Sequence, residues 1–297
     1  MPQPTEMSPD PDSFSSSSEG ADLLSVGEIL VARAYLYELW HKLFATAPDA
    51  ETLDALLSEQ TGEVLGVVAE GNEVLEALSG HLAAMRGTED RAALLKAVRG
   101  EYTRSFIGPA EPVALPFASP YKTRDRAVFQ MNTVEVRRWY RRFGLEPAQL
   151  LRIPDDHVAI ICAFCAHQAQ ELADAFLEGD AGRLAAVLVD QLQFVPEHVN
   201  SWAGDYAYRM RASETALLYP QLVEAFAAFA KQDEAFLAGL GMRATRPAGT
   251  PDEEFASQGP RLAEELEGAL QALRGIQTLR PANVEDCELR AVGAEER

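Results

Sequence analysis

The stretch Leu151-Arg-Ile-Pro-Asp-Asp-His157, followed directly by an apolar run that reaches Ala166, decides the fold of this chain. Pro154 has a backbone angle suited to the first turn of a helix, and either aspartate can accept hydrogen bonds from the free N–H groups there. The stretch therefore predicts the start of a buried helix. It also places His157, whose charge can respond to a neighbour or a ligand, at the mouth of that helix.

Outward from this point, apolar residues recur every three or four positions, and the Val/Ile/Thr alternation typical of strands is absent. The sequence therefore predicts an all-α protein. We expect the first helix to begin after Ser25 and end before Pro48. Predicted helices of the second half span residues 155–178, 181–194, 197–212 and 214–240, and a further amphipathic helix spans 260–276.

Breaks in the helical pattern divide the chain into four parts. Residues 1–24 form an acidic, Ser-rich leader that we expect to be disordered, and residues 25–150 form an N-terminal helical half with a proline-rich loop at 107–121. Residues 151–241 form a C-terminal helical half, and residues 242–297 form an extension with one helix and a frayed tail. We expect the two helical halves to meet at a hinge near residue 150.

Composition limits the classes of function. The 297 residues are 47% hydrophobic, enough for a sizeable core, and carry a formal charge of −20, which repels nucleic acids and favours a basic peptide partner. Three cysteines, an odd number, argue against a secreted disulfide framework. The segment Met1 to Gly20 lacks the basic and apolar regions of a signal peptide, and no apolar run reaches the ~20 residues that cross a bilayer. We expect a cytoplasmic protein without stable membrane insertion.

Catalytic sequence signatures such as GxxxxGK[ST], GxSxG and GxGxxG are absent, so we predict that the protein is not an enzyme and needs no cofactor. Four residues of zinc-ligand type do fall within eleven positions, namely His157, Cys162, Cys165 and His167. A continuous helix points such residues to different sides, which favours core packing and no metal site. A zinc or redox protein that uses Cys162 and Cys165 is the alternative.

Five short motifs carry a family resemblance, in the order Glu101-Tyr-Thr-Arg-Ser-Phe106 with Gly108-Pro109, Pro116-Phe-Ala-Ser-Pro-Tyr121, Pro154-Asp-Asp-His157, His198-x-x-x-Trp202, and Tyr219-Pro220. The chain resembles the TorD/DmsD/NarJ family of cytoplasmic molybdoenzyme maturation chaperones. Asp156 and His157 match the end of the family's Glu-Pro-x-Asp-His motif, whereas Ile153 stands in place of its Glu and Ser105 in place of the Leu of another motif.

The resemblance implies a TorD-like multi-helix bundle and a chaperone that binds the twin-arginine signal peptide or the body of a molybdopterin oxidoreductase subunit, assists cofactor insertion and delays export. Several aromatic residues flank the proline-rich loop and the hinge, where an apolar groove with acidic edges suits such a peptide. The predicted peptide-binding residues are Tyr102, Phe106, Pro116, Tyr121, Asp155, Asp156, His157, Phe164, His198 and Trp202. Two further possibilities stay open, a helical protein–protein adaptor and a domain-swapped dimer in place of a monomer.

Overall fold

The computed structural model describes residues 12–108, 112–122, 131–149, 152–213, 215–246 and 250–292, and it confirms the all-α class. Its α-helices are α1 (Asp12–Ala45), α2 (Ala50–Leu56), α3 (Glu59–Ala69), α4 (Glu73–Arg86), α5 (Arg91–Tyr102), α6 (Ser119–Lys122), α7 (Met131–Arg142), α8 (Val158–Glu178), α9 (Ala181–Phe194), α10 (Ser201–Met210), α11 (Tyr219–Ala244), α12 (Glu253–Ala256) and α13 (Glu267–Thr278). Shorter elements are the π-helices η1 (Thr103–Ile107) and η2 (Val195–Asn200), the 3₁₀-helices η4 (Gly259–Leu262) and η5 (Val284–Cys287), and the strands β1 (Leu145–Pro147), β2 (Thr245–Arg246), β3 (Thr250–Pro251) and β4 (Leu289–Ala291).

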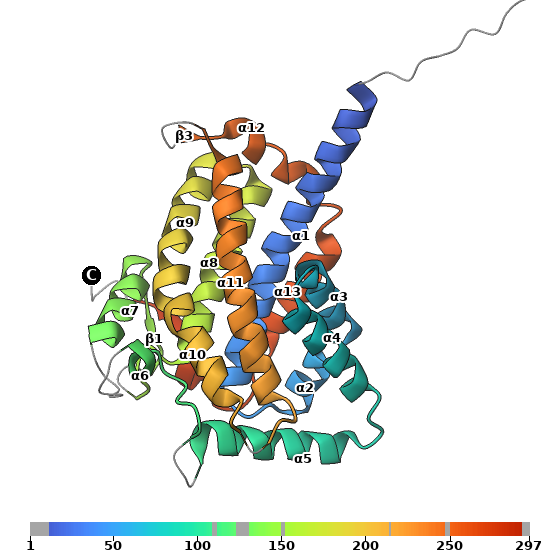
Figure 1. The fold of residues 1–297 in the computed structure, drawn as a ribbon. Coiled ribbons are helices and arrows are strands. Elements are labelled where there is room, and N and C mark those ends of the chain that lie inside the picture. Colours follow the sequence, from blue (N-terminus) through green and yellow to red (C-terminus); the bar gives the residue numbers. More distant parts are fainter. Residues whose placement is uncertain are drawn as a thin grey trace, which may run out of the picture.

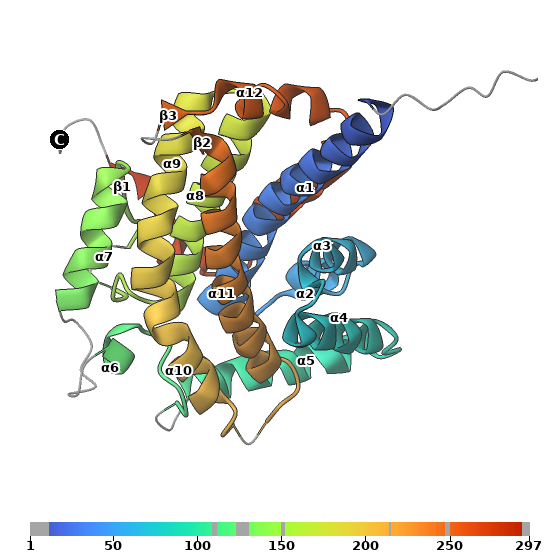
Figure 2. The ribbon, with the colours of Figure 1, turned by 45° about the horizontal axis from the view of Figure 1, so that its top comes forward.

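A bundle of α1, α8, α9 and α11 forms the body, and α5 lies across one end of it (Figures 1 and 2). Helix α8 is apolar around most of its circumference, so it is buried at the centre, and α1 makes its most extensive contact with it. Inside the bundle, the guanidinium of Arg33 on α1 forms an ion pair with Asp233 on α11, and it donates to Gln191 on α9 at 2.6 Å. This buried network joins three of the four helices.

The observed helix boundaries agree best with the predicted ones where a side chain caps the start of the helix. The predicted helix 181–194 is α9. Asp180, whose residue type just before this helix favours an N-cap, accepts a hydrogen bond from the backbone N–H of Arg183 at 2.9 Å. The expected capping of α8 by an aspartate is wrong, because the N-cap is His157, whose Nδ1 accepts from the backbone N–H of Ala159 at 3.1 Å. The cap side chain is thus also a candidate site residue.

Helix α1 begins at Asp12 rather than after Ser25, so it extends into the segment predicted to be disordered. The rest of that leader, residues 1–11, lies outside the described residues. So do residues 123–130, the start of a helix that the sequence pattern predicts from about Thr123 through Phe143. The single helix expected over 260–276 is instead η4 followed by α13.

The C-terminal extension packs against the body. Helix α13 lies along α1, and β4 pairs antiparallel with β1, so that Leu289 faces Pro147. The hydroxyl of Thr46, just after α1, donates to the carbonyl of Ala282 at 2.7 Å. One cluster of buried side chains runs from Val31 to Cys287, so both predicted halves and the extension share a core. Among the described segments, no helix is both long enough and apolar enough to cross a membrane.

Candidate functional site

The two aspartates before α8 anchor the segment that enters the helix. The carboxylate of Asp155 has no exposed surface and receives two hydrogen bonds from Arg137 on α7, at 2.5 and 2.9 Å. Its backbone carbonyl accepts from the hydroxyl of Tyr140 at 2.9 Å. Hydrogen bonding to the Asp155 carboxylate raises the pKa of the Arg137 guanidinium. Asp155 therefore fixes α7 to the start of α8.

Asp156 binds the proline-rich loop instead. Its carboxylate, also fully buried, accepts from the backbone N–H of Ser119 at 2.8 Å, from the Ser119 hydroxyl, and from Thr133 at 3.1 Å. Its backbone carbonyl accepts from Ala118 N–H at 3.1 Å, and Val158 N–H donates to Pro116 at 2.8 Å. These bonds bring the loop and the helix entrance together as one rigid unit.

His157 lies at the edge of this unit. Its ring packs edge-on against Phe117 at 5.0 Å between centroids, and the two residues form an antiparallel bridge. Burial, with a smaller contribution from His41, lowers the pKa of His157 from 6.5 to about 3, so the ring is neutral at pH 7. Because Nδ1 accepts the cap hydrogen bond, the neutral ring carries its proton on Nε2.

A cleft of about 610 Å³ opens beside His157. One wall is apolar, and Ile107 within it is 66% exposed. The apolar lining includes Tyr102, Phe106, Ile107, Pro116, Phe117, Ile153 and Pro154, and the charged lining consists of Asp49, Arg99, Arg152 and Asp286. The cleft therefore combines an open apolar surface with charged groups of both signs.

The motif around Tyr102 positions that apolar wall. The Tyr102 and Phe106 rings stack at 4.7 Å, and both pack edge-on against Tyr219 at the start of α11. Glu101, fully buried, accepts hydrogen bonds from the backbone N–H groups of residues 217–219 at 2.7, 2.7 and 3.0 Å. Its carboxylate satisfies N–H groups at the N-terminus of α11, so α5 and α11 are held together there.

The ten predicted site residues separate into three groups. Four line the cleft, namely Tyr102, Phe106, Pro116 and His157. Asp155 and Asp156 lie buried behind it. The others belong to an aromatic cluster away from it, in which Tyr121 stacks on Trp202, Trp202 donates to the carbonyl of His198 at 2.6 Å, and Phe164 packs on Phe194. The structure therefore brings together only part of the predicted set at one surface.

Two comparisons with known proteins identify sequences that are similar to this chain. A family model described as nitrate reductase delta subunit matches residues 67–207, a segment that contains the Tyr102 motif, the proline-rich loop, the Asp-His segment and Trp202. Chaperone protein TorD of Vibrio vulnificus (strain YJ016) is 25% identical over 207 residues, which cover 70% of this chain and 95% of that protein. Both comparisons support the resemblance of this chain to the TorD/DmsD/NarJ family of maturation chaperones.

Other TorD relatives extend the likeness to further genera. The TorD chaperone of Aliivibrio salmonicida (strain LFI1238) is 23% identical over 70% of this chain and 95% of its own length. That of Shewanella sp. (strain ANA-3) is 24% identical over 60% of this chain and 79% of its own length. The TorD/DmsD/NarJ family consists of chaperones rather than catalytic enzymes, in agreement with the sequence-based prediction.

The sequence did not indicate several residues of the cleft. Ala282, Asn283, Asp286 and Cys287 come from the extension, beyond the matched segment, and Asp49 and Arg99 come from the first half. Arg152 stands next to the Asp-His motif, which is a signal that could have identified it. The extension residues carry no motif, so only the folded chain reveals them.

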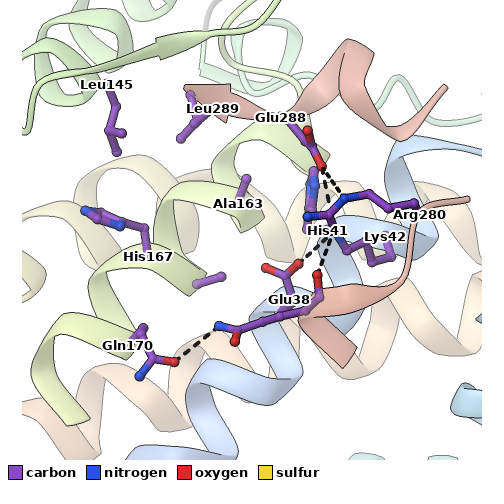
Figure 3. Close-up of a pocket in the computed structure, with 12 residues that line it drawn as sticks. Glu38, His41, Lys42, Leu145, Ala163, His167, Gln170, Arg280, Glu288 and Leu289 are labelled. Carbon is purple, nitrogen blue, oxygen red and sulfur yellow. Dashed lines mark hydrogen bonds and ion pairs between the residues drawn. The ribbon is translucent and has the colours of Figure 1, made fainter. Parts of the chain in front are cut away.

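A second cavity, of about 360 Å³, lies between α1, α8 and the extension (Figure 3). The ammonium of Lys42 lies 2.9 Å from Glu38 and 3.9 Å from Glu288, and Arg280 lies 4.0 Å from the same Glu288 oxygen. Gln277 donates to Gln170 at 3.2 Å. These contacts connect the extension to α1 and α8, so we assign this cavity to the packing of the extension.

The cysteines of α8 occupy core positions. Cys162 and Cys165 are buried and free, and burial raises the pKa of both thiols. Within the described residues, His, Cys, Asp and Glu side chains form no group of three or more that could hold a metal ion. This arrangement gives no support to the zinc or redox alternative.

Proposed function

We propose that this protein is a cytoplasmic chaperone that binds the twin-arginine signal peptide of a molybdopterin oxidoreductase subunit in the cleft beside His157. The observation that carries the proposal is the cleft itself, which presents apolar side chains, among them the exposed Ile107, next to carboxylates in a chain of formal charge −20. Such a peptide joins arginines to an apolar segment. The likeness to TorD chaperones and to the nitrate reductase delta subunit family supports the same role.

The size of the cleft suits a short apolar segment. Burying about four apolar side chains stabilises a complex by roughly 6–12 kcal/mol, against an association cost of roughly 4–15 kcal/mol. The expected affinity is therefore modest, with a dissociation constant near the micromolar range. A chaperone that must release its client needs reversible binding of this strength.

The proposed consequence of binding is that export of the client is delayed. A signal peptide held in the cleft is withheld from export while the molybdopterin cofactor is inserted into the client. His157 contributes through its neutral ring, whose Nε2–H is a donor on a residue that lines the cleft. Asp155 and Asp156, which are buried, contribute by holding this wall in place.

Calorimetric titration tests the proposal. The purified protein is titrated with a twin-arginine signal peptide of a molybdoenzyme encoded near it and with the same peptide in which glutamines replace both arginines. We expect micromolar binding of the first peptide and a loss of at least tenfold for the second. Ile107→Asp should weaken binding, because it places a charge on the apolar wall, whereas Val189→Asp, at a half-exposed position on α9 outside the cleft, should not. Equal effects of both variants would contradict the proposed location.

A further inference from the structure

The extension forms one wall of the cleft, and the body holds that wall firmly. Four residues of the segment Ala282–Cys287 line the cleft, and Val284 and Cys287 are buried in the core. Thr46 donates to the carbonyl at its start, and the β1–β4 pairing follows its end. In addition, Ala148 N–H donates to the carbonyl of Glu288 at 2.8 Å. The side chain of Asp286 is therefore presented from a fixed backbone.

Asp286 carries a mostly buried carboxylate into the cleft. Its side chain is 16% exposed, and its carboxylate accepts a hydrogen bond from the guanidinium of Arg152 at 2.8 Å. The Arg152 side chain is 62% exposed, and it also lines the cleft. The pair thus joins an anchored anion to a cation that reaches it from solvent.

The other carboxylate of the cleft is already used by the fold. Asp49 is the N-cap of α2, and its Oδ1 accepts from the backbone N–H of Thr52 at 2.8 Å. A guanidinium that competed for Asp49 would disturb a helix start, whereas one that competed for Asp286 would displace an exposed side chain. Asp286 is therefore the carboxylate that an incoming cation can reach at the lowest cost.

We propose that Asp286 is the recognition residue for an arginine of the client, and that Arg152 occupies it in the free protein and is displaced on binding. This inference rests on the proposed function. Solvent reaches the largely exposed Arg152 side chain and screens its attraction to Asp286, so displacing it costs little. A client guanidinium that closes over the cleft is better shielded from water than Arg152 and can bind the carboxylate through two parallel hydrogen bonds. The exchange preserves the charge balance at Asp286.

Two substitutions separate this role from a structural one. Asp286→Asn and Arg152→Gln break the same ion pair, so a purely structural effect would change peptide affinity in the same direction in both. If Asp286 binds the client arginine, Asp286→Asn should weaken calorimetric binding of the twin-arginine peptide about tenfold, and Arg152→Gln should strengthen it about threefold. Both variants should unfold cooperatively, within a few degrees of the wild type.

A second peptide sharpens the test. Lysines in place of both arginines retain the charge but lose the paired hydrogen bonds, so the wild type should bind this peptide more weakly. The Asp286→Asn variant should bind both peptides equally. If Asp286→Asn leaves affinity unchanged while Ile107→Asp reduces it, the inference is wrong and the proposed function stands. If the wild type binds none of the peptides, both are wrong.

Discussion

Asp156 and His157 are neighbours in the sequence, yet they belong to two regions with different tasks. Asp156 is fully buried, and hydroxyl and backbone donors surround its carboxylate. His157 lines the cleft and retains a donor on its ring. The first region holds the proline-rich loop in place, and the second lines the cleft. A single short motif thus combines a residue that secures the fold with a residue of the proposed binding site.

The largest effect is expected in the buried region, for Arg137→Met. It leaves the buried carboxylate of Asp155 without its charged partner, and we expect a loss of about 3 kcal/mol in the free energy of unfolding, measured by urea denaturation. Arg138→Met, at the next and exposed position of α7, is the matched control and should change stability by less than about 0.5 kcal/mol. Equal stabilities of the two variants would show that Asp155 does not anchor α7.

The next largest effect is expected for Asp156→Ala, which removes the acceptor of several buried hydrogen-bond donors. It should lower the free energy of unfolding by about 2–3 kcal/mol, again measured by urea denaturation. Asp156→Asn retains an acceptor oxygen and should cost less. An Asp156 variant that keeps the wild-type stability but loses client binding would contradict this assignment, because Asp156 would then act in binding, as His157 is proposed to do.

In the cleft, we expect a substitution to change the affinity for the peptide more than the stability of the protein. Ile107→Asp should lower the affinity for the signal peptide about tenfold, equivalent to about 1.4 kcal/mol, with little change in stability, because its side chain is largely exposed. Thermal unfolding and peptide titration of the same sample check both parts. A large drop in the unfolding temperature would assign Ile107 to the fold.

The smallest effect at pH 7 is expected for His157→Asn, because Asn is also a good N-cap. The unfolded chain protonates this histidine below about pH 6.5, whereas burial lowers the pKa in the folded protein to about 3, so the wild type loses stability as the pH falls through this interval. The variant should lose less between pH 7 and pH 5. His198, whose pKa burial lowers to about 4, keeps part of the dependence in both proteins. Identical pH profiles would show that His157 titrates normally.

Much of the fold could be predicted from local patterns. The helix 181–194 agrees with α9 at both ends, because apolar spacing and the cap Asp180 indicate the same start. The π-helices η1 and η2 were not predicted, since nothing local distinguishes them from α-helix. The β1–β4 pairing joins strands of three residues from distant parts of the chain, too short for a strand pattern.

The candidate site was predictable only on the side that carries motifs. Tyr102, Phe106, Pro116 and His157 came from motifs, and they do line one cleft. Sequence could not show that Asp156 is turned inward, because an aspartate before a helix can cap, bind or anchor with the same local pattern. It also could not show the wall formed by Asp286, which depends on how the extension returns to the body.

The packing of the extension against the body has a consequence for how such a chaperone can diversify. Packing of α5, α11 and the helix entrance constrains one wall of the cleft, whereas the wall around Asn283 and Asp286 is a short surface segment secured mainly by backbone hydrogen bonds and two buried side chains. Substitutions at its outward positions should therefore leave the bundle intact. If Asp286 recognises the client as proposed, a change of a few residues in this segment would alter client preference while the bundle stays the same.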